Sequence, residues 1–223
     1  MKPATIALDG PAASGKSTVG SRVAEALDYL FFDTGVMYRA VTWIVLQRGV
    51  DILDEAAVAK LTEETPIDVL PPSQDDGRAC DVLVENEDIT WQCRRPEVDA
   101  NVSIVAANPG VRDALSMQQR RIGLRGKVVM VGRDIGTVVL PEAELKIYLD
   151  ASAEERAQRR YDEIIARGEE ADYAEILSKV IQRDHVDSTR DVAPLRPADD
   201  AIIIDYDKLD ADQVFEKIMA LSV

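Results

Sequence analysis

The sequence predicts an α/β protein in which helices flank a parallel β-sheet and a small β-containing insertion interrupts the core. Short apolar runs rich in β-branched residues, typical of strands buried on both faces, alternate with segments of helical periodicity. Pro66, Pro71, Pro72 and Gly77 instead punctuate stretches that alternate with a period of two, as antiparallel strands do. The predicted boundaries are 1–48 and 97–223 for the core, 49–96 for the insertion and about 151–170 for a short lid within the core.

The individual elements follow from the spacing of apolar residues. Val19, Val23 and Leu27 recur at helical spacing directly after the first apolar run, which gives a strand–loop–helix opening. The predicted strands of the core are 5–8, 30–32, 127–131, 145–149 and 201–204, and those of the insertion are 67–70 and 81–84. The predicted helices are 16–27, 36–47, 98–119, 153–166 and 173–187, with a last one from 211.

Between the first strand and the first helix lies a phosphate-binding motif. Its eight positions fit the P-loop pattern, in which small residues let backbone N–H groups curl around phosphate oxygens. Lys16 is expected to reach the β and γ phosphates, and the Ser17 hydroxyl to ligate Mg²⁺. The alternative is a glycine turn capped by Ser14 or Ser17, but the flanking strand and helix favour a P-loop NTPase-type core. The residues predicted to bind ATP are Gly10, Pro11, Ala12, Ala13, Ser14, Gly15, Lys16, Ser17 and Thr18.

Composition excludes several classes of protein. The formal charge of −15 argues against binding a nucleic acid polymer or an anionic membrane surface through general charge neutralisation. No apolar run approaches a membrane span, and the N-terminus lacks a signal-peptide pattern, so we expect a cytoplasmic protein, most simply a monomer. Neither the guanine signature of GTPases nor a Gly-x-Gly dinucleotide fingerprint occurs. A kinase for a small anionic acceptor fits best.

Basic residues concentrate in one part of this acidic chain. Residues 94–133 hold eight basic and three acidic side chains, whereas residues 51–93 hold two basic and twelve acidic ones. One interpretation is a basic cleft that binds a small anion, and the other is a pair of complementary surfaces that pack together. Charge alone does not separate the two.

Three further segments carry motifs beyond the P-loop. They read Asp33-Thr34-Gly35-Val36-Met37-Tyr38-Arg39, Gly132-Arg133-Asp134-Ile135-Gly136-Thr137, and Arg183, Asp187 and Arg190 followed by Val192-Ala193-Pro194-Leu195. Together and in this order they resemble the motifs of bacterial cytidylate kinases, and the similarity runs essentially from end to end. The insertion also suits that family.

The resemblance implies transfer of the γ-phosphoryl group of ATP to CMP or dCMP, with Mg²⁺ as cofactor. By the same resemblance Arg39, Arg133 and Arg190 hold the acceptor phosphate, Ser103, Arg112 and Asp134 read the cytosine, and Arg183 with Asp187 faces the sugar. Thr34 either touches the ligand or caps the following helix. The residues implied in catalysis are Lys16, Arg133, Arg190 and two lid arginines, Arg156 and Arg160.

Residue chemistry supports these roles independently. Cytosine offers an amine donor beside acceptors, so reading it requires a carboxylate next to a donor, and uracil would turn an acceptor against Asp134. Arg183, Asp187 and Arg190 share one helical face if the helix persists. The alternatives are ordinary ion pairs: a ladder along that helix, a cap pair for Arg133 and Asp134, and a Glu155–Arg159 pair in the lid.

Two positions stand apart from the family pattern. Val131 occupies a position where the family usually has an acidic residue that steadies Mg²⁺ through water, and this predicts weaker Mg²⁺ dependence at low metal. His185, the single histidine, is predicted to lie on a helix surface without a role. Two other functions stay open at this stage: a P-loop kinase for UMP, AMP or another metabolite, and a non-catalytic ATP-binding regulator.

Overall fold

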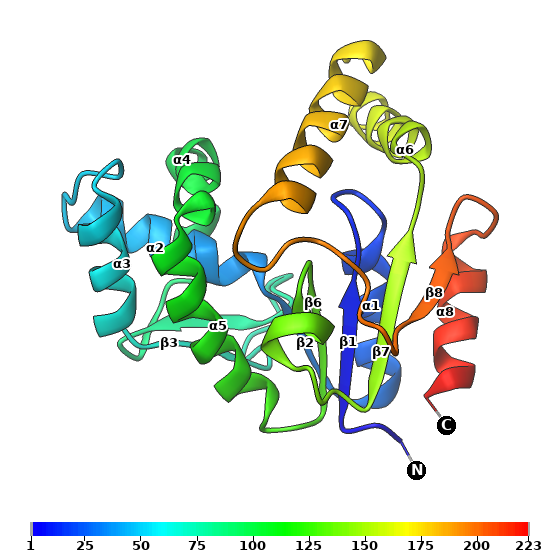
Figure 1. The fold of residues 1–223 in the computed structure, drawn as a ribbon, viewed down its shortest axis with the longest axis horizontal. Helices are drawn as coiled ribbons and strands as arrows, with labels where there is room; N and C mark the ends of the chain where they lie inside the picture. Colours follow the sequence, from blue (N-terminus) through cyan, green and yellow to red (C-terminus); the bar gives the residue numbers. More distant parts are fainter. Residues whose placement is uncertain (1, 223) are drawn as a thin grey trace.

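A computed structural model, which describes residues 2–222, confirms the α/β class (Figure 1). Its central sheet has the strand order β2-β6-β1-β7-β8, and each pairing is parallel. The carboxyl ends of the strands therefore meet along one edge, where α/β proteins bind ligands. The strands are β1 (Thr5–Asp9), β2 (Leu30–Asp33), β6 (Val128–Gly132), β7 (Leu145–Asp150) and β8 (Ile202–Asp205).

Helices cover both faces of the sheet. Successive residues of a strand point to opposite faces, so Ile6 and Leu8 of β1 join one apolar cluster and Ala7 joins the other. The first cluster lies under α1 (Lys16–Leu27) and α8 (Ala211–Leu221), and the second under α2 (Gly35–Gln47). Burial of each aliphatic side chain contributes about 1.5–3 kcal/mol, and this fixes the strands whose ends carry the site.

The insertion contains a helix that the sequence analysis did not predict. This helix, α3 (Glu55–Glu64), begins at Asp54, whose side chain accepts a hydrogen bond from Ala57 N at 3.0 Å. The predicted antiparallel strands are confirmed, and a third short strand joins them: the sheet consists of β3 (Ile67–Leu70), β4 (Asp81–Val84) and β5 (Glu87–Asp88). Its buried residues belong to the second apolar cluster of the core. The domain boundaries at 49 and 96 stay a prediction.

The single helix predicted over 98–119 is wrong, because the chain folds there into α4 (Pro96–Ala107) and α5 (Pro109–Gly123). Pro109 disfavours helical backbone at Asn108, and the Asn108 side chain caps α5 by accepting from Val111 N at 3.3 Å. The break has a functional consequence. Ser103 on α4 and Arg112 on α5 line the same cavity.

The predicted lid, about 151–170, falls on α6 (Ala153–Ala166) and stays a prediction. In Figure 1, α6 and α7 (Tyr173–Thr189) stand beyond the carboxyl ends of the strands. Both helices were predicted. Two short turns were not, the 3₁₀ turn Gln92–Arg94 and the π-helical turn Ile135–Val139. Within residues 2–222, no helix combines the length and apolar character needed to cross a membrane.

Candidate active site

The P-loop lies at the carboxyl end of β1 and turns directly into α1, as predicted. Gly15 has φ 82°, and a Cβ atom there would stand 2.4 Å from Cε1 of Tyr206, so both its backbone conformation and its packing require glycine. Lys16 is only 5% exposed, and its ammonium donates to Pro11 O at 2.5 Å and to Ser14 Oγ at 3.1 Å. Burial, followed by the nearby Arg133 charge, lowers the pKa of Lys16 well below its usual value. The loop holds its cation inward.

Asp33 stands beside the P-loop serine, at the end of β2. Ser17 Oγ donates to Asp33 Oδ2 at 2.7 Å, while Asp33 Oδ1 accepts from Gly35 N at 3.0 Å at the start of α2. Val131, where the family pattern has an acidic residue, is buried and is the register partner of Asp33 on β6. The neighbouring strand thus supplies a carboxylate that position 131 lacks. Asp33 belongs to the first of the three motifs in the sequence, but the sequence pattern predicted no role for it.

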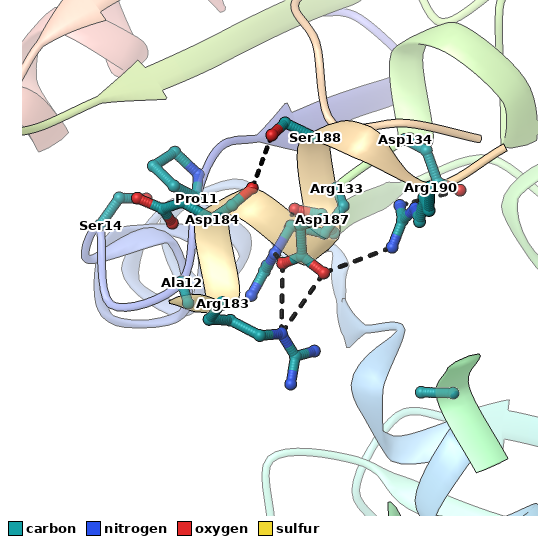
Figure 2. A network of polar contacts seen from close by, with 12 residues as sticks. Pro11, Ala12, Ser14, Arg133, Asp134, Arg183, Asp184, Asp187, Ser188 and Arg190 are labelled. Carbon is teal, nitrogen blue, oxygen red and sulfur yellow. Dashed lines mark hydrogen bonds and ion pairs between the residues drawn. The ribbon is translucent and has the colours of Figure 1, made fainter. Parts of the chain in front are cut away.

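Asp187 on α7 gathers three arginines (Figure 2). Its side chain is 3% exposed and accepts from Arg133 Nε at 3.1 Å, Arg183 Nε at 3.3 Å and Arg190 Nη1 at 3.5 Å. Burial raises the pKa of Asp187, but the Arg133 and Arg183 charges outweigh burial and hold that pKa below its ordinary value. Arg190 lies just past the end of α7 rather than on its face, which corrects the predicted helical spacing.

A second buried carboxylate, Asp134, forms an ion pair with Arg112. Arg112 Nη2 donates to Asp134 Oδ2 at 2.7 Å, and the two side chains are 6% and 9% exposed. Arg190 Nη2 lies 3.9 Å from the same oxygen. Burial and the neighbouring Arg112 charge lower the pKa of Arg190. Among the described residues, Arg112 Nε and Arg190 Nη2 are buried without a hydrogen-bond partner, so this part of the site has donors to offer a ligand.

A cavity of about 570 Å³ opens at these side chains. Five predicted acceptor residues line it: Ser103, Arg112, Arg183, Asp187 and Arg190. Thr34 lies elsewhere, with its hydroxyl donating to Val131 O at 3.0 Å instead of capping α2. Arg39 forms an ion pair with Asp99 on α4. The fold therefore brings most of the predicted acceptor set together, with Arg39 engaged by a carboxylate.

The two predicted lid arginines differ in their surroundings. Arg156 is buried and ties α6 to the P-loop and to α7: Nη1 donates to Ala12 O at 3.0 Å and to Asp184 on α7 at 2.9 Å. Arg160 is half exposed and contacts Glu163 at 3.2 Å. Between them, Arg159 lies over the Tyr206 ring at 4.0 Å. His185 is exposed on α7, as predicted.

The basic stretch 94–133 serves both of the uses left open by its charge. Arg112 and Arg133 contact the carboxylates of the site, as described above. Arg125 instead pairs with Asp68 of the insertion at 2.8 Å, and Arg121 donates to Ile67 O at 2.9 Å. The stretch therefore forms part of the cleft and part of a packed interface.

The geometry first defines a class of protein. A P-loop with a buried lysine faces an arginine-lined cavity across the carboxyl edge of a parallel sheet, and this arrangement is that of a P-loop phosphotransferase acting on an anionic acceptor. Similarity to known proteins narrows the class. The Cytidylate kinase family model matches residues 6–222.

Individual relatives agree with the family model. A cytidylate kinase of Herpetosiphon aurantiacus is 52% identical over 98% of this chain and 94% of its own length, and one of Roseiflexus castenholzii is 51% identical over 98% and 93%. The chain belongs to the cytidylate kinase family. An uncharacterized protein of Eubacterium ventriosum with a solved structure aligns with a TM-score of 0.50 at 13% identity over 99% of this chain and 98% of that one, a likeness of fold alone.

Proposed function

We propose that this protein transfers the γ-phosphoryl group of ATP to CMP and dCMP, giving ADP with CDP or dCDP. The observation that carries the proposal is the buried pair of Asp134 with Arg112 at 2.7 Å, in which Arg112 lines the cavity. It places an acceptor oxygen beside guanidinium donors, the combination that cytosine requires and that uracil would meet with an acceptor against Asp134. Ser103 lines the same cavity and adds a hydroxyl.

The acceptor phosphate is proposed to bind Arg39, Arg133 and Arg190. In the structure Asp187 occupies Arg133 and Arg190, and Asp99 occupies Arg39. A dianionic phosphate accepts hydrogen bonds from guanidinium groups, as these carboxylates do, and can take their place. Arg183 and Asp187 are then left to face the sugar.

Catalysis is proposed to rest on positioning and on neutralisation of charge, since phosphoryl transfer needs little covalent chemistry from the protein. Lys16, Arg133 and Arg190 supply fixed positive charge. The half-exposed Arg160 is proposed to swing over the transferring group. Arg156, which contacts Ala12 O and Asp184, is proposed to anchor the lid to the P-loop. Lid closure would exclude water and so suppress ATP hydrolysis.

Mg²⁺ is proposed to reach the site with ATP. Its protein contacts would be Ser17 Oγ and, directly or through water, Asp33, because hydroxyl and carboxylate oxygens are the donors that this ion prefers. Among the described residues, no group of three or more His, Cys, Asp or Glu side chains is placed to hold a metal ion. In such a site the triphosphate would supply most of the oxygens. We expect Asp33→Asn to raise the Mg²⁺ concentration needed for half-maximal turnover about tenfold. Val131→Asp tests the family position, and Mn²⁺ binding with ATP, followed by electron paramagnetic resonance, checks both variants without turnover.

The test of the function is ADP release with MgATP and, in parallel, CMP, dCMP, UMP, AMP or GMP. Strong turnover with CMP and dCMP alone would support the reaction and the cytosine-reading residues together. Preference for another acceptor would keep the kinase and overturn the assignment of the base site. ATP binding without acceptor-dependent turnover would instead favour a nucleotide-binding regulator.

A further inference from the structure

Asp9 is a buried carboxylate that the proposed reaction does not use. It is the last residue of β1, directly before the P-loop, and is 4% exposed. Its two oxygens accept hydrogen bonds from successive backbone amides: Ile135 N donates to Oδ1 and Gly136 N to Oδ2, each at 2.8 Å. The two contacts join segments 126 and 127 residues apart in the chain.

These two amides begin the π-helical turn Ile135–Val139, and the turn follows immediately on Arg133 and Asp134. The first N–H groups of a helical turn lack partners within the turn and are normally satisfied by a capping side chain close in sequence. The cap residue here, Asp134, makes no side-chain capping bond, because its carboxylate pairs with Arg112. Asp9 caps the turn from the end of another strand, and the Asp134 carboxylate stays paired with Arg112, which lines the cavity.

The surroundings of Asp9 disfavour the charged form of its carboxylate. The pKa of Asp9 is raised to about 6, chiefly by burial. The Gly136 and Ile135 amides and Lys16 on α1 act to lower it, and Asp134 acts to raise it. From β7, Tyr148 pairs with Asp9 in register, and the Lys146 stem lies beside Gly136. A carboxylate kept where the charged form is disfavoured is a candidate for a functional role.

We propose that Asp9 is a positioning residue that fixes the Arg133–Asp134 turn against the P-loop and thereby sets the register between the donor loop and the reader of the acceptor base. The inference rests on the proposed function, because its readout is the choice of acceptor. Asp9 adjoins Gly10 on one side and holds the backbone two residues beyond Asp134 on the other. A shift of the Asp9 carboxylate would therefore move Asp134, which is proposed to read the acceptor base, relative to the ATP phosphates on the P-loop.

The experiment compares wild type with Asp9→Asn, whose amide nitrogen cannot accept and so leaves one backbone donor without a partner. We expect kcat/KM for CMP to fall about 10- to 100-fold, the scale of a misplacement of about 1 Å, while KM for ATP changes less than about threefold. The preference for CMP over UMP should shrink as well. Asp150→Asn is the matched control, since it removes an exposed carboxylate from the end of the neighbouring strand β7.

A double-mutant cycle separates positioning from general loss of structure. In an Asp134→Asn background the base reader is already impaired, so adding Asp9→Asn should cost much less in CMP preference than it does alone. Additive effects on that preference, or equal losses in KM for CMP and ATP, would overturn the proposal. Wild type that does not turn over CMP would refute the proposed function, whereas active wild type with an unaffected Asp9→Asn variant would refute this inference alone.

Folding of the variants is checked by circular dichroism, and Asp9→Ser is a second variant that keeps one accepting oxygen. If neither folds, wild type decides the matter through its ratio of kcat/KM for CMP and UMP at pH 7.5 and 5.0. Both acceptors carry the same phosphate, so its ionisation cancels in the ratio. Asp9 takes up a proton as the pH drops through about 6. A preference for CMP over UMP that falls over this range supports the proposal, and a constant preference overturns it.

Discussion

The donor loop, Gly10–Ser17, is a continuous run of eight residues, whereas the acceptor cavity collects side chains from α4, α5, α7 and the segment that follows α7. Lys16 contacts Pro11 and Ser14, both within five residues. Arg112 and Asp134 are 22 residues apart in sequence, and Arg133 and Asp187 are 54 apart. One region depends on local backbone conformation and the other on the packing of the whole chain.

This difference predicts two kinds of failure. A change in the donor loop should disturb the handling of ATP and leave the acceptor cavity intact. A change in the cavity should disturb the acceptor while ATP still binds, unless the changed residue joins the two regions, as Asp9 and Arg156 do.

The largest expected effect comes from Lys16→Met, which keeps the length of the side chain and removes its charge. We expect turnover to fall about a thousandfold, because a buried donor to the transferring phosphoryl group is lost. Calorimetry should show CMP binding unchanged. Lys60→Met, at an exposed position of α3, is the control. Turnover within tenfold of wild type would mean that the two regions do not divide the work as proposed.

Arg190→Ala tests the other side of the comparison. This side chain lies near both Asp134 and Asp187, so its removal takes positive charge from the proposed phosphate site and leaves each carboxylate with one partner fewer. We expect turnover to fall about a hundredfold and the dissociation constant for ATP to stay near that of wild type. The exposed Arg196→Ala provides a control six residues along the chain. Loss of ATP binding would contradict the separation of the two regions.

The same difference explains how much of the structure can be predicted from the sequence. The P-loop, the sheet and the helices α6 and α7 have local signatures, and each was predicted from spacing and flanking residues. The pairing of Arg112 with Asp134 and of Arg133 with Asp187 has no such signature, since no local pattern brings residues 22 or 54 positions apart together; family resemblance named these residues, and residue chemistry supported their roles. Asp9 and Asp33 were missed for that reason. The break at Asn108-Pro109 did have a local signal, which the helical periodicity on either side obscured.

Asp9 offers a prediction about pH and stability. Its pKa is about 6 in the folded protein against an ordinary 3.8, so the folded state binds its proton more tightly than the unfolded state. The favourable contribution is present below about pH 3.8 and is lost as pH rises through about 6. Urea unfolding of wild type and Asp9→Asn should show the difference in free energy moving by about 2–3 kcal/mol in favour of the variant between pH 4 and pH 7.

Parallel stability curves for the two proteins would show that Asp9 does not titrate in this range and would remove the electrostatic support for its role.

Asp187 should behave in the opposite sense. Burial raises the pKa of Asp187, but the Arg133 and Arg183 charges lower it by more, so its folded pKa lies below its unfolded pKa. Asp187 therefore stabilises the fold at neutral pH, and this contribution is lost as the pH falls below the unfolded pKa.

The smallest expected effect concerns Asp99, which pairs with Arg39 where Asp187 pairs with Arg133. The Arg39 and Asp99 side chains are 33% and 53% exposed, and such a pair contributes about 0–1 kcal/mol. Asp99→Ala frees Arg39 for the acceptor phosphate, so KM for CMP should fall by at most about fivefold, with the exposed Asp113→Ala as control. Removal of the Asp187 carboxylate would leave three arginines around a buried position without the acceptor they share, so it should raise KM for CMP. The two substitutions therefore change KM in opposite directions, because Asp99 only competes with the phosphate, whereas Asp187 also orients the arginines that bind it.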